Sequence, residues 1–125
     1  VVDEAVSRVG AAELGRALVA REGREHAPDV RVHHGDVAAV VGELERPPGL
    51  VVLDPPRRGA GRKVVEAVAA TSPRAIAHVA CDPAALARDL KLFAEQGYRP
   101  RTIQAFDLFP MTHHVEAVAI LEREV

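Results

Sequence analysis

The chain has 125 residues, of which 48% are hydrophobic and 27% are charged, and its formal net charge is -2. This length and composition are typical of one soluble globular domain. No segment approaches the ~18 to 20 consecutive apolar residues of a membrane span, and the start of the chain lacks the charge pattern of a signal peptide. A single cysteine excludes an internal disulfide framework, so we expect a cytoplasmic protein with no membrane partner.

The first half of the chain alternates between helix-like and strand-like segments. Residues 3–22 carry apolar side chains at helical spacing, residues 30–34 form a short β-branched run, and residues 37–44 fit a short helix. Residues 50–53 and 75–80 are continuous apolar runs, which are typical of strands covered on both faces in a parallel sheet. The pattern therefore favours alternating helices and parallel strands.

The second half of the chain continues this alternation and ends differently. Residues 61–70 keep their valines on one helical face, and another helix begins at Pro83 with Asp82 as its N-cap. Residues 98–106 and 115–121 read as two strands with no room for a helix between them, so they should pair antiparallel. The sequence predicts an α/β fold with a three-layer, mostly parallel sheet and an antiparallel C-terminal strand.

Polar residues follow the ends of the predicted strands. Asp36, Asp54 and Cys81 each come directly after or just beyond a strand, and Glu116 opens the last one. Open α/β sheets place their chemistry beyond the carboxyl ends of the strands. Cys81 is therefore a candidate nucleophile, although a lone cysteine after an apolar run is usually a small buried hydrophobe. Asp54 precedes two prolines, which force the backbone to turn away at that point.

The basic residues are unevenly spread, and two readings of them stay open. Arg57, Arg58, Arg62 and Lys63 lie close together in the sequence, and Arg88 follows in a later helix. Such a patch steers a phosphate backbone even when the average charge is not basic. Solvated arginines on exposed helices explain the same pattern equally well.

The histidines do not predict a metal site. His33 and His34 are adjacent, as are His113 and His114. Neighbouring side chains in extended backbone point to opposite faces, so neither pair supplies two ligands to one ion. We therefore expect no metal, and His114 is a candidate for hydrogen bonding near Glu116.

Three motifs resemble one family of enzymes. Asp54-Pro55-Pro56-Arg57-Arg58-Gly59, the run from Ala80 to Leu90 and the run from Asp107 to Glu116 occur in the order and spacing of the RNA 5-methyluridine (uracil-C5) methyltransferases. The resemblance implies a Rossmann-like class I methyltransferase fold that uses S-adenosyl-L-methionine. It also implies that the substrate is RNA, either tRNA or rRNA, and no obligate protein partner is expected.

The resemblance assigns roles to four residues. Carbon 5 of uracil is a poor nucleophile, so a thiolate first adds to carbon 6, and Cys81 stands at the place of that nucleophile. Glu116 stands at the place of the base that later removes the proton from carbon 5. Asp54 and Asp36 are the expected cofactor-binding residues.

The same resemblance implies that the chain is only part of a catalytic domain. Residues 1–125 lack the first βα unit with its glycine-rich turn and any RNA-binding domain, so we expect an N-terminally truncated domain that is inactive alone. The acid that holds the ribose hydroxyls would be Asp3 or Glu4. Asp82 stands where the family often has asparagine.

Two other functions remain open from the residues alone. Amino-group methyltransferases of nucleic acids also place an acidic or amide residue before two prolines, but they then need an aromatic residue to stack the base, and Arg57 is not aromatic. The other alternative is a non-catalytic Rossmann-like remnant that binds RNA or a partner, with Cys81 as a filler of the core.

Overall fold

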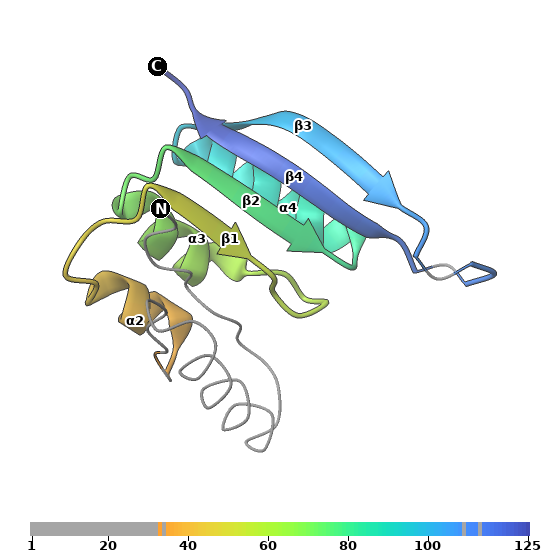
Figure 1. The fold of residues 1–125 in the computed structure, drawn as a ribbon, viewed down its shortest axis with the longest axis horizontal. Helices are drawn as coiled ribbons and strands as arrows, with labels where there is room; N and C mark the ends of the chain where they lie inside the picture. Colours follow the sequence, from red (N-terminus) through yellow and green to blue (C-terminus); the bar gives the residue numbers. More distant parts are fainter. Residues whose placement is uncertain (1–32, 34, 109, 113) are drawn as a thin grey trace, which may run out of the picture.

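The computed structural model describes residues 33, 35–108, 110–112 and 114–125. The expected helix over residues 3–22 and all of the expected strand over 30–34 except His33 lie outside this part of the chain. The described part alternates helices and strands (Figure 1): α2 (Val37–Gly42), β1 (Leu50–Leu53), α3 (Gly61–Ala70), β2 (Ala75–Ala80), α4 (Pro83–Glu95), β3 (Tyr98–Phe106) and β4 (Glu116–Arg123).

The described strands form one sheet in the order β1-β2-β4-β3. β1 and β2 are parallel, whereas β4 is antiparallel to both of its neighbours, β2 and β3. The last strand therefore inserts between β2 and β3 and runs against the other described strands (Figure 1). This confirms the predicted mostly parallel sheet with an antiparallel C-terminal strand, and it places the start of β4 beside the end of β2.

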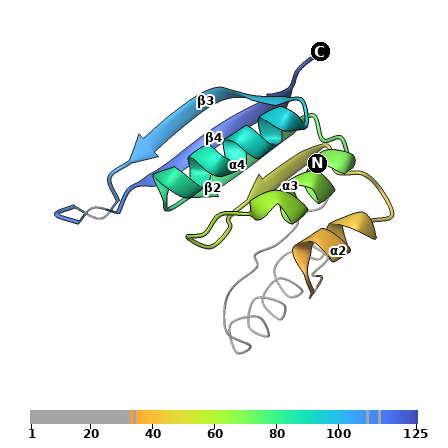
Figure 2. The same ribbon diagram turned by 180° about the vertical axis from the view of Figure 1, so that it is seen from behind.

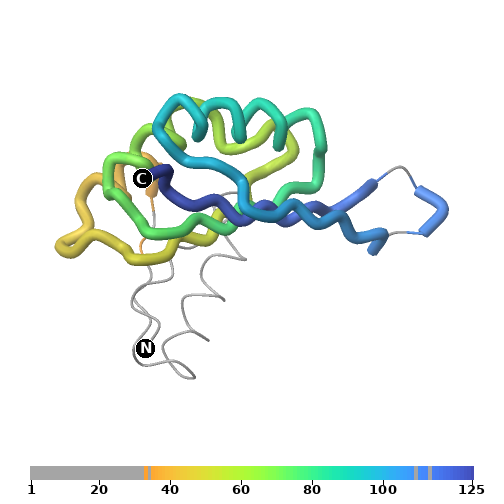
Figure 3. Tube along the Cα trace, turned by 90° about the horizontal axis from the view of Figure 1, so that it is seen from above, coloured from red at the N-terminus to blue at the C-terminus, as the bar shows by residue number. Residues whose placement is uncertain are grey.

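Helices α3 and α4 lie together on one face of the sheet, and α2 packs beside α3 (Figures 2 and 3). The strand side chains that point toward these helices are buried and alternate with half-buried or exposed ones in β1, β2 and β4. Such period-2 burial is what one covered face produces. The buried strand side chains are those of Val51, Leu53, Ile76, His78, Ala80, Ala117, Ala119 and Leu121.

Two buried aromatic rings close the core where α4 meets β3. Phe93 and Tyr98 pack edge to face with ring centroids 6.3 Å apart. The hydroxyl of Tyr98 donates a hydrogen bond of 2.8 Å to the carbonyl oxygen of Pro73, so the buried hydroxyl group has a hydrogen-bond partner. Burial raises the pKa of Tyr98, and nearby Arg123 opposes this shift.

The element boundaries agree with the local sequence signals, with small differences. The carboxylate of Asp82 accepts a hydrogen bond of 2.7 Å from the backbone of Ala85, which confirms the predicted N-cap of α4. α2 ends at Gly42, two residues before the predicted end, and β4 continues to Arg123, two residues beyond its predicted end. No helix in the described part of the chain is long and apolar enough to cross a membrane.

Candidate active site

The register between β2 and β4 brings Cys81 next to Glu116. Ala80, the last residue of β2, pairs with Ala117 in the antiparallel ladder, and Cys81 directly follows β2 while Glu116 is the first residue of β4. Opposite residues on antiparallel strands lie about 5 Å apart at Cα, so the paired ladder ends within one residue of both Cys81 and Glu116. Both residues are half-buried, which leaves the thiol partly accessible. Residues 35 positions apart in the sequence therefore meet at one edge of the sheet.

Asp54 belongs to the same edge. Leu53 pairs with His78 in the parallel ladder, so Asp54 leaves β1 just before Cys81 leaves β2. Successive strand side chains alternate between faces. Ala117 is buried toward the helices, so its neighbour Glu116 in β4 points to the opposite face, and Asp54 and Cys81 directly follow β1 and β2 at the same edge of the sheet.

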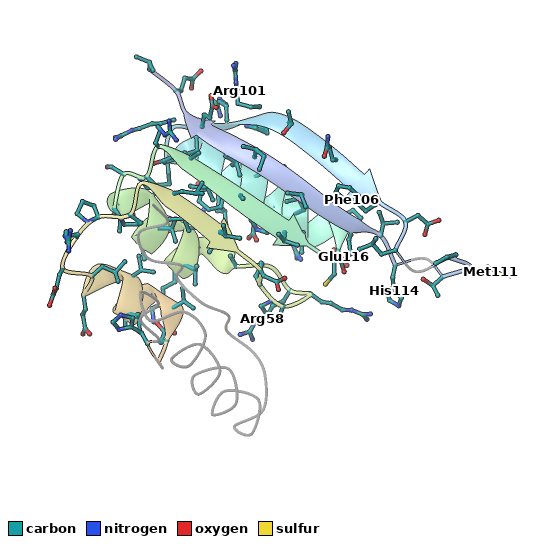
Figure 4. All side chains as sticks on the ribbon, viewed as in Figure 1. Arg58, Arg101, Phe106, Met111, His114 and Glu116 are labelled. Carbon is teal, nitrogen blue, oxygen red and sulfur yellow. The ribbon has the colours of Figure 1, made fainter. Side chains whose placement is uncertain are left out.

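A contact between two loops joins the motif after β1 to the segment before β4. Nη2 of Arg57 lies 3.1 Å from Nδ1 and 3.2 Å from Nε2 of His114. His114 and Glu116 lie at the same end of the sheet as Arg58, whereas Arg101 lies at the opposite end (Figure 4). This contact between the two loops therefore lies at the same edge of the sheet as Cys81. The sequence predicts a hydrogen bond of His114 near Glu116 but not this contact with Arg57.

Asp36 lies on the helix side of the molecule as the N-cap of α2. Its Oδ1 accepts hydrogen bonds of 3.2 Å from the backbone of Ala39 and of 3.2 Å from Nζ of Lys63. The hydrogen bond from Lys63, reinforced by the one from Ala39, lowers the pKa of Asp36. Capping accounts for this residue type, and its expected part in cofactor binding stays a prediction.

A buried carboxylate holds the loop that carries Asp54 and Arg57. Oδ2 of Asp89 accepts a hydrogen bond of 2.7 Å from the backbone of Ala60, and Oδ1 accepts one of 3.0 Å from Gly61. Ala60 is the N-cap of α3 and has no side-chain acceptor of its own. Asp89, on α4, therefore caps the neighbouring helix from outside, and its negative charge suits the positive end of α3.

The sequence predicts no role for Asp89, and only the structure identifies this one. Asp89 is 2% exposed and its Oδ2 lies 2.8 Å from Nε2 of the fully buried His78. A signal was available: Asp89 falls on the apolar stripe of α4 between Leu86 and Phe93. An acid on such a stripe needs buried hydrogen-bond donors.

The pKa of Asp89 follows from these contacts. Burial alone raises it, but the hydrogen bonds from His78 and from the backbone of Ala60 and Gly61 outweigh burial and bring the pKa below its ordinary value. The carboxylate is therefore ionised at neutral pH, as its capping role requires.

Several basic residues in the described part form surface ion pairs, and these pairs explain the presence of the basic residues without any ligand. Such exposed pairs are typical of solvated helix and strand faces. The pairs are Arg62 with Glu66 and Glu95, Lys63 with Asp36, Arg99 with Glu124, and Arg101 with Glu122. Among the described residues there is no group of three or more His, Cys, Asp or Glu side chains arranged to hold a metal ion.

Comparison with known proteins then decides the family. The model of the family described as tRNA (Uracil-5-)-methyltransferase matches residues 45–124, which include the three motifs and every described strand. The chain belongs to this family. An uncharacterized RNA methyltransferase of Streptomyces avermitilis is 60% identical over 98 residues, covering 74% of this chain and 22% of that protein.

Solved structures of similar proteins share the fold of this uracil-5-methyltransferase family member. The tRNA (uracil-54, C5)-methyltransferase of Pyrococcus abyssi, in complex with S-adenosyl-L-homocysteine, is 31% identical with a TM-score of 0.72, covering 88% of this chain and 26% of that one. A precorrin-6y C5,15-methyltransferase of Geobacter metallireducens matches with a TM-score of 0.69 at 14% identity, over 98% of this chain and 66% of that one. The fold is that of the Rossmann-like class I methyltransferases, as predicted. The chain spans about a quarter or less of the family relatives it matches.

Proposed function

We propose that the protein containing this chain methylates carbon 5 of a uridine in tRNA or rRNA with S-adenosyl-L-methionine as the methyl donor, and that Cys81 and Glu116 carry the chemistry. The register that sets Cys81 beside Glu116 at the carboxyl end of β2 is the observation that supports this most directly. Membership of the family supports the reaction class. The relative from Pyrococcus abyssi acts on uracil 54 of tRNA by its description, which supports uridine as the target.

Cys81 would begin the reaction as a nucleophile. Its thiolate forms a carbon–sulfur bond to carbon 6 of the uracil ring, and the electron pair of the carbon 5–carbon 6 double bond moves onto carbon 5 and the adjoining carbonyl. The half-buried position of Cys81 leaves its sulfur partly accessible for this approach. The cofactor supplies an electrophilic methyl group, which the activated carbon 5 takes up.

Glu116 would end the reaction as a base. Its carboxylate removes the proton from carbon 5, the electron pair re-forms the carbon 5–carbon 6 double bond, and the Cys81 sulfur leaves as thiolate. The overall balance is one methyl group gained and one proton lost by the uridine. Glu116 stands on the strand next to Cys81, so both residues reach the same ring.

Asp54 and Asp36 would hold the cofactor. Both carboxylates are exposed, and Asp54 lies at the strand ends where open α/β sheets bind their ligands. Carboxylate oxygens accept hydrogen bonds from amino and hydroxyl groups, which an adenosine-containing cofactor presents. These acceptor groups therefore suit an adenosine-containing cofactor. Isothermal titration with S-adenosyl-L-homocysteine should show weaker binding to Asp54→Ala and Asp36→Ala, and unchanged binding to Glu66→Gln on the exposed side of α3.

The nucleophile is tested by trapping. RNA that carries 5-fluorouracil in place of the target uracil has fluorine on carbon 5 and therefore no removable proton there. The methylated adduct should stay bound to the protein and shift its band on a denaturing gel. Cys81→Ala in the intact protein should form no adduct. An undiminished adduct from Cys81→Ala, or no adduct from the unaltered protein with any RNA, contradicts the proposal.

Glu116 is tested with ordinary uridine. Glu116→Gln should transfer the methyl group but fail to release the product, so a labelled methyl accumulates in a covalent RNA–protein complex. Glu122→Gln serves as the matched control, since Glu122 lies on the same strand at its other end and pairs with Arg101 on the surface. Release of methylated RNA by Glu116→Gln at the rate of this control would exclude Glu116 as the base.

A further inference from the structure

Phe106 differs from the other aromatic residues that the structure describes. Phe93 and Tyr98 are 0% and 1% exposed and fill the core, whereas Phe106 leaves 40% of its surface in solvent. A phenyl ring gains free energy when a ligand covers it, so an exposed ring beside the candidate site is available for binding. The position of the ring indicates what that ligand is.

The β3–β4 register places Phe106 directly opposite Glu116. These two residues form the last pair of the antiparallel ladder, and directly opposite side chains share one face of a sheet. The β2–β4 register in turn brings Glu116 to the end of β2, which Cys81 directly follows. Figure 4 shows Phe106 and Glu116 at the same end of the sheet. The exposed ring therefore lies on the same face as Glu116, at the edge of the sheet where Cys81 follows β2.

An exposed aromatic ring on a sheet surface suits one kind of ligand at this edge. Unpaired bases stack on aromatic side chains, and enzymes that modify a base hold it out of its own stack. Arg57 and Arg58, in the loop after β1, lie toward the same end and supply positive charge for the phosphate backbone. A phenyl ring has no hydrogen-bonding group, so it contributes affinity and orientation but no base identity.

From this placement we infer that Phe106 stacks on the uracil that Cys81 attacks and holds its plane at the sheet edge. The inference rests on the proposed function, because it takes Cys81 and Glu116 as the reacting residues. It adds a substrate-positioning residue on β3, a strand that carries neither of them.

The test measures the affinity of RNA rather than catalysis. The probe is a short, fluorescently labelled, single-stranded RNA with one uridine, titrated into the intact protein and followed by anisotropy. Stacking contributes about 1–3 kcal/mol per base, so Phe106→Ala should weaken binding by roughly 5- to 150-fold. Phe106→Trp should restore most of the affinity, whereas Phe106→Leu, which keeps the apolar volume without the ring, should not.

Two controls separate stacking from other effects. Ile103 lies on the same strand as Phe106 and is 54% exposed, but it pairs with Ala119 and so belongs to the other face. Ile103→Ala should therefore leave RNA binding unchanged. Replacing the single uridine by an abasic site should remove the difference between Phe106→Ala and the unaltered protein, because no base is then left to stack.

The outcomes distinguish this inference from the proposed function. Unchanged RNA affinity of Phe106→Ala, or an equal loss in Ile103→Ala, overturns the role of Phe106 even if the Cys81 adduct forms normally. Loss of self-association in Phe106→Ala with unchanged RNA affinity would assign the ring to a protein interface and also overturn it. Stacking that depends on the uridine, without any Cys81 adduct, would uphold base binding by Phe106 and refute the proposed reaction.

Discussion

Nε2 of His78 lies 2.8 Å from Oδ2 of Asp89, and this buried pair links the middle of β2 to the second turn of α4. The same carboxylate accepts hydrogen bonds from the backbone N–H groups of Ala60 and Gly61, so it also caps α3. One side chain thus joins two helices, a strand and the loop that carries Asp54. It serves the site by holding that loop, without touching the reacting atoms in our proposal.

Removing this carboxylate should cost much of the stability of the domain. Asp89→Ala leaves His78 and two backbone N–H groups without their acceptor, and each buried donor left unsatisfied costs about 1–3 kcal/mol. Urea unfolding followed by circular dichroism measures the change. Glu66→Ala, which removes an exposed carboxylate paired with Arg62, should hardly alter the unfolding midpoint. Similar midpoints for the two variants would contradict the capping role of Asp89.

The stability should also fall in acid through Asp89. Its pKa is lowered in the folded protein, so its contribution is complete above the unfolded value of about 3.9 and is lost as the pH falls through the folded value. Urea midpoints measured from neutral pH to about pH 3 should decline for the unaltered protein and decline less for Asp89→Asn. Asp36 adds to the decline, but it is exposed and salt screens its pair with Lys63. A slope that salt abolishes entirely would show that Asp89 does not contribute.

Gly59 should be required for two separate reasons. Its φ of +86° is unfavourable for other residues by roughly 1–2 kcal/mol, and a Cβ there would lie 2.8 Å from Oδ2 of Asp89. Gly61 has φ of +78° but open space around its Cβ position. Gly61→Ala should therefore cost only the backbone energy, and Gly59→Ala distinctly more. Equal unfolding free energies for the two variants would show that Asp89 yields without cost.

Asp82 should be replaceable by asparagine but not by alanine. The hydrogen bond that it accepts from Ala85 caps α4, and loss of such a cap costs about 1 kcal/mol. Asparagine is an equally good N-cap, so Asp82→Asn should keep the melting temperature while Asp82→Ala lowers it. Thermal unfolding by calorimetry compares them. A melting temperature of Asp82→Asn as low as that of Asp82→Ala would mean that the negative charge, rather than the cap, is what stabilises α4.

Much of the described fold could be predicted because its signals are local. The apolar runs of β1 and β2, the valine stripe of α3 and the Asp82 cap of α4 each depend on residues within a few positions of one another. Cys81, Asp54 and Glu116 were candidates for the same reason, since each stands at a strand end. Hydrophobic period and capping chemistry act over one or two turns and are therefore visible in the chain itself.

Contacts between distant segments were decided only by the tertiary structure. The insertion of β4 between β2 and β3 sets Glu116 beside Cys81 and opposite Phe106, and no local pattern states that strand order. The cap of α3 comes from Asp89, 29 positions beyond Ala60, and is fixed by the packing of α3 on α4. Register and interhelical packing depend on how whole faces are buried together, so the sequence determined which residues stand ready and the assembled sheet determined which of them meet.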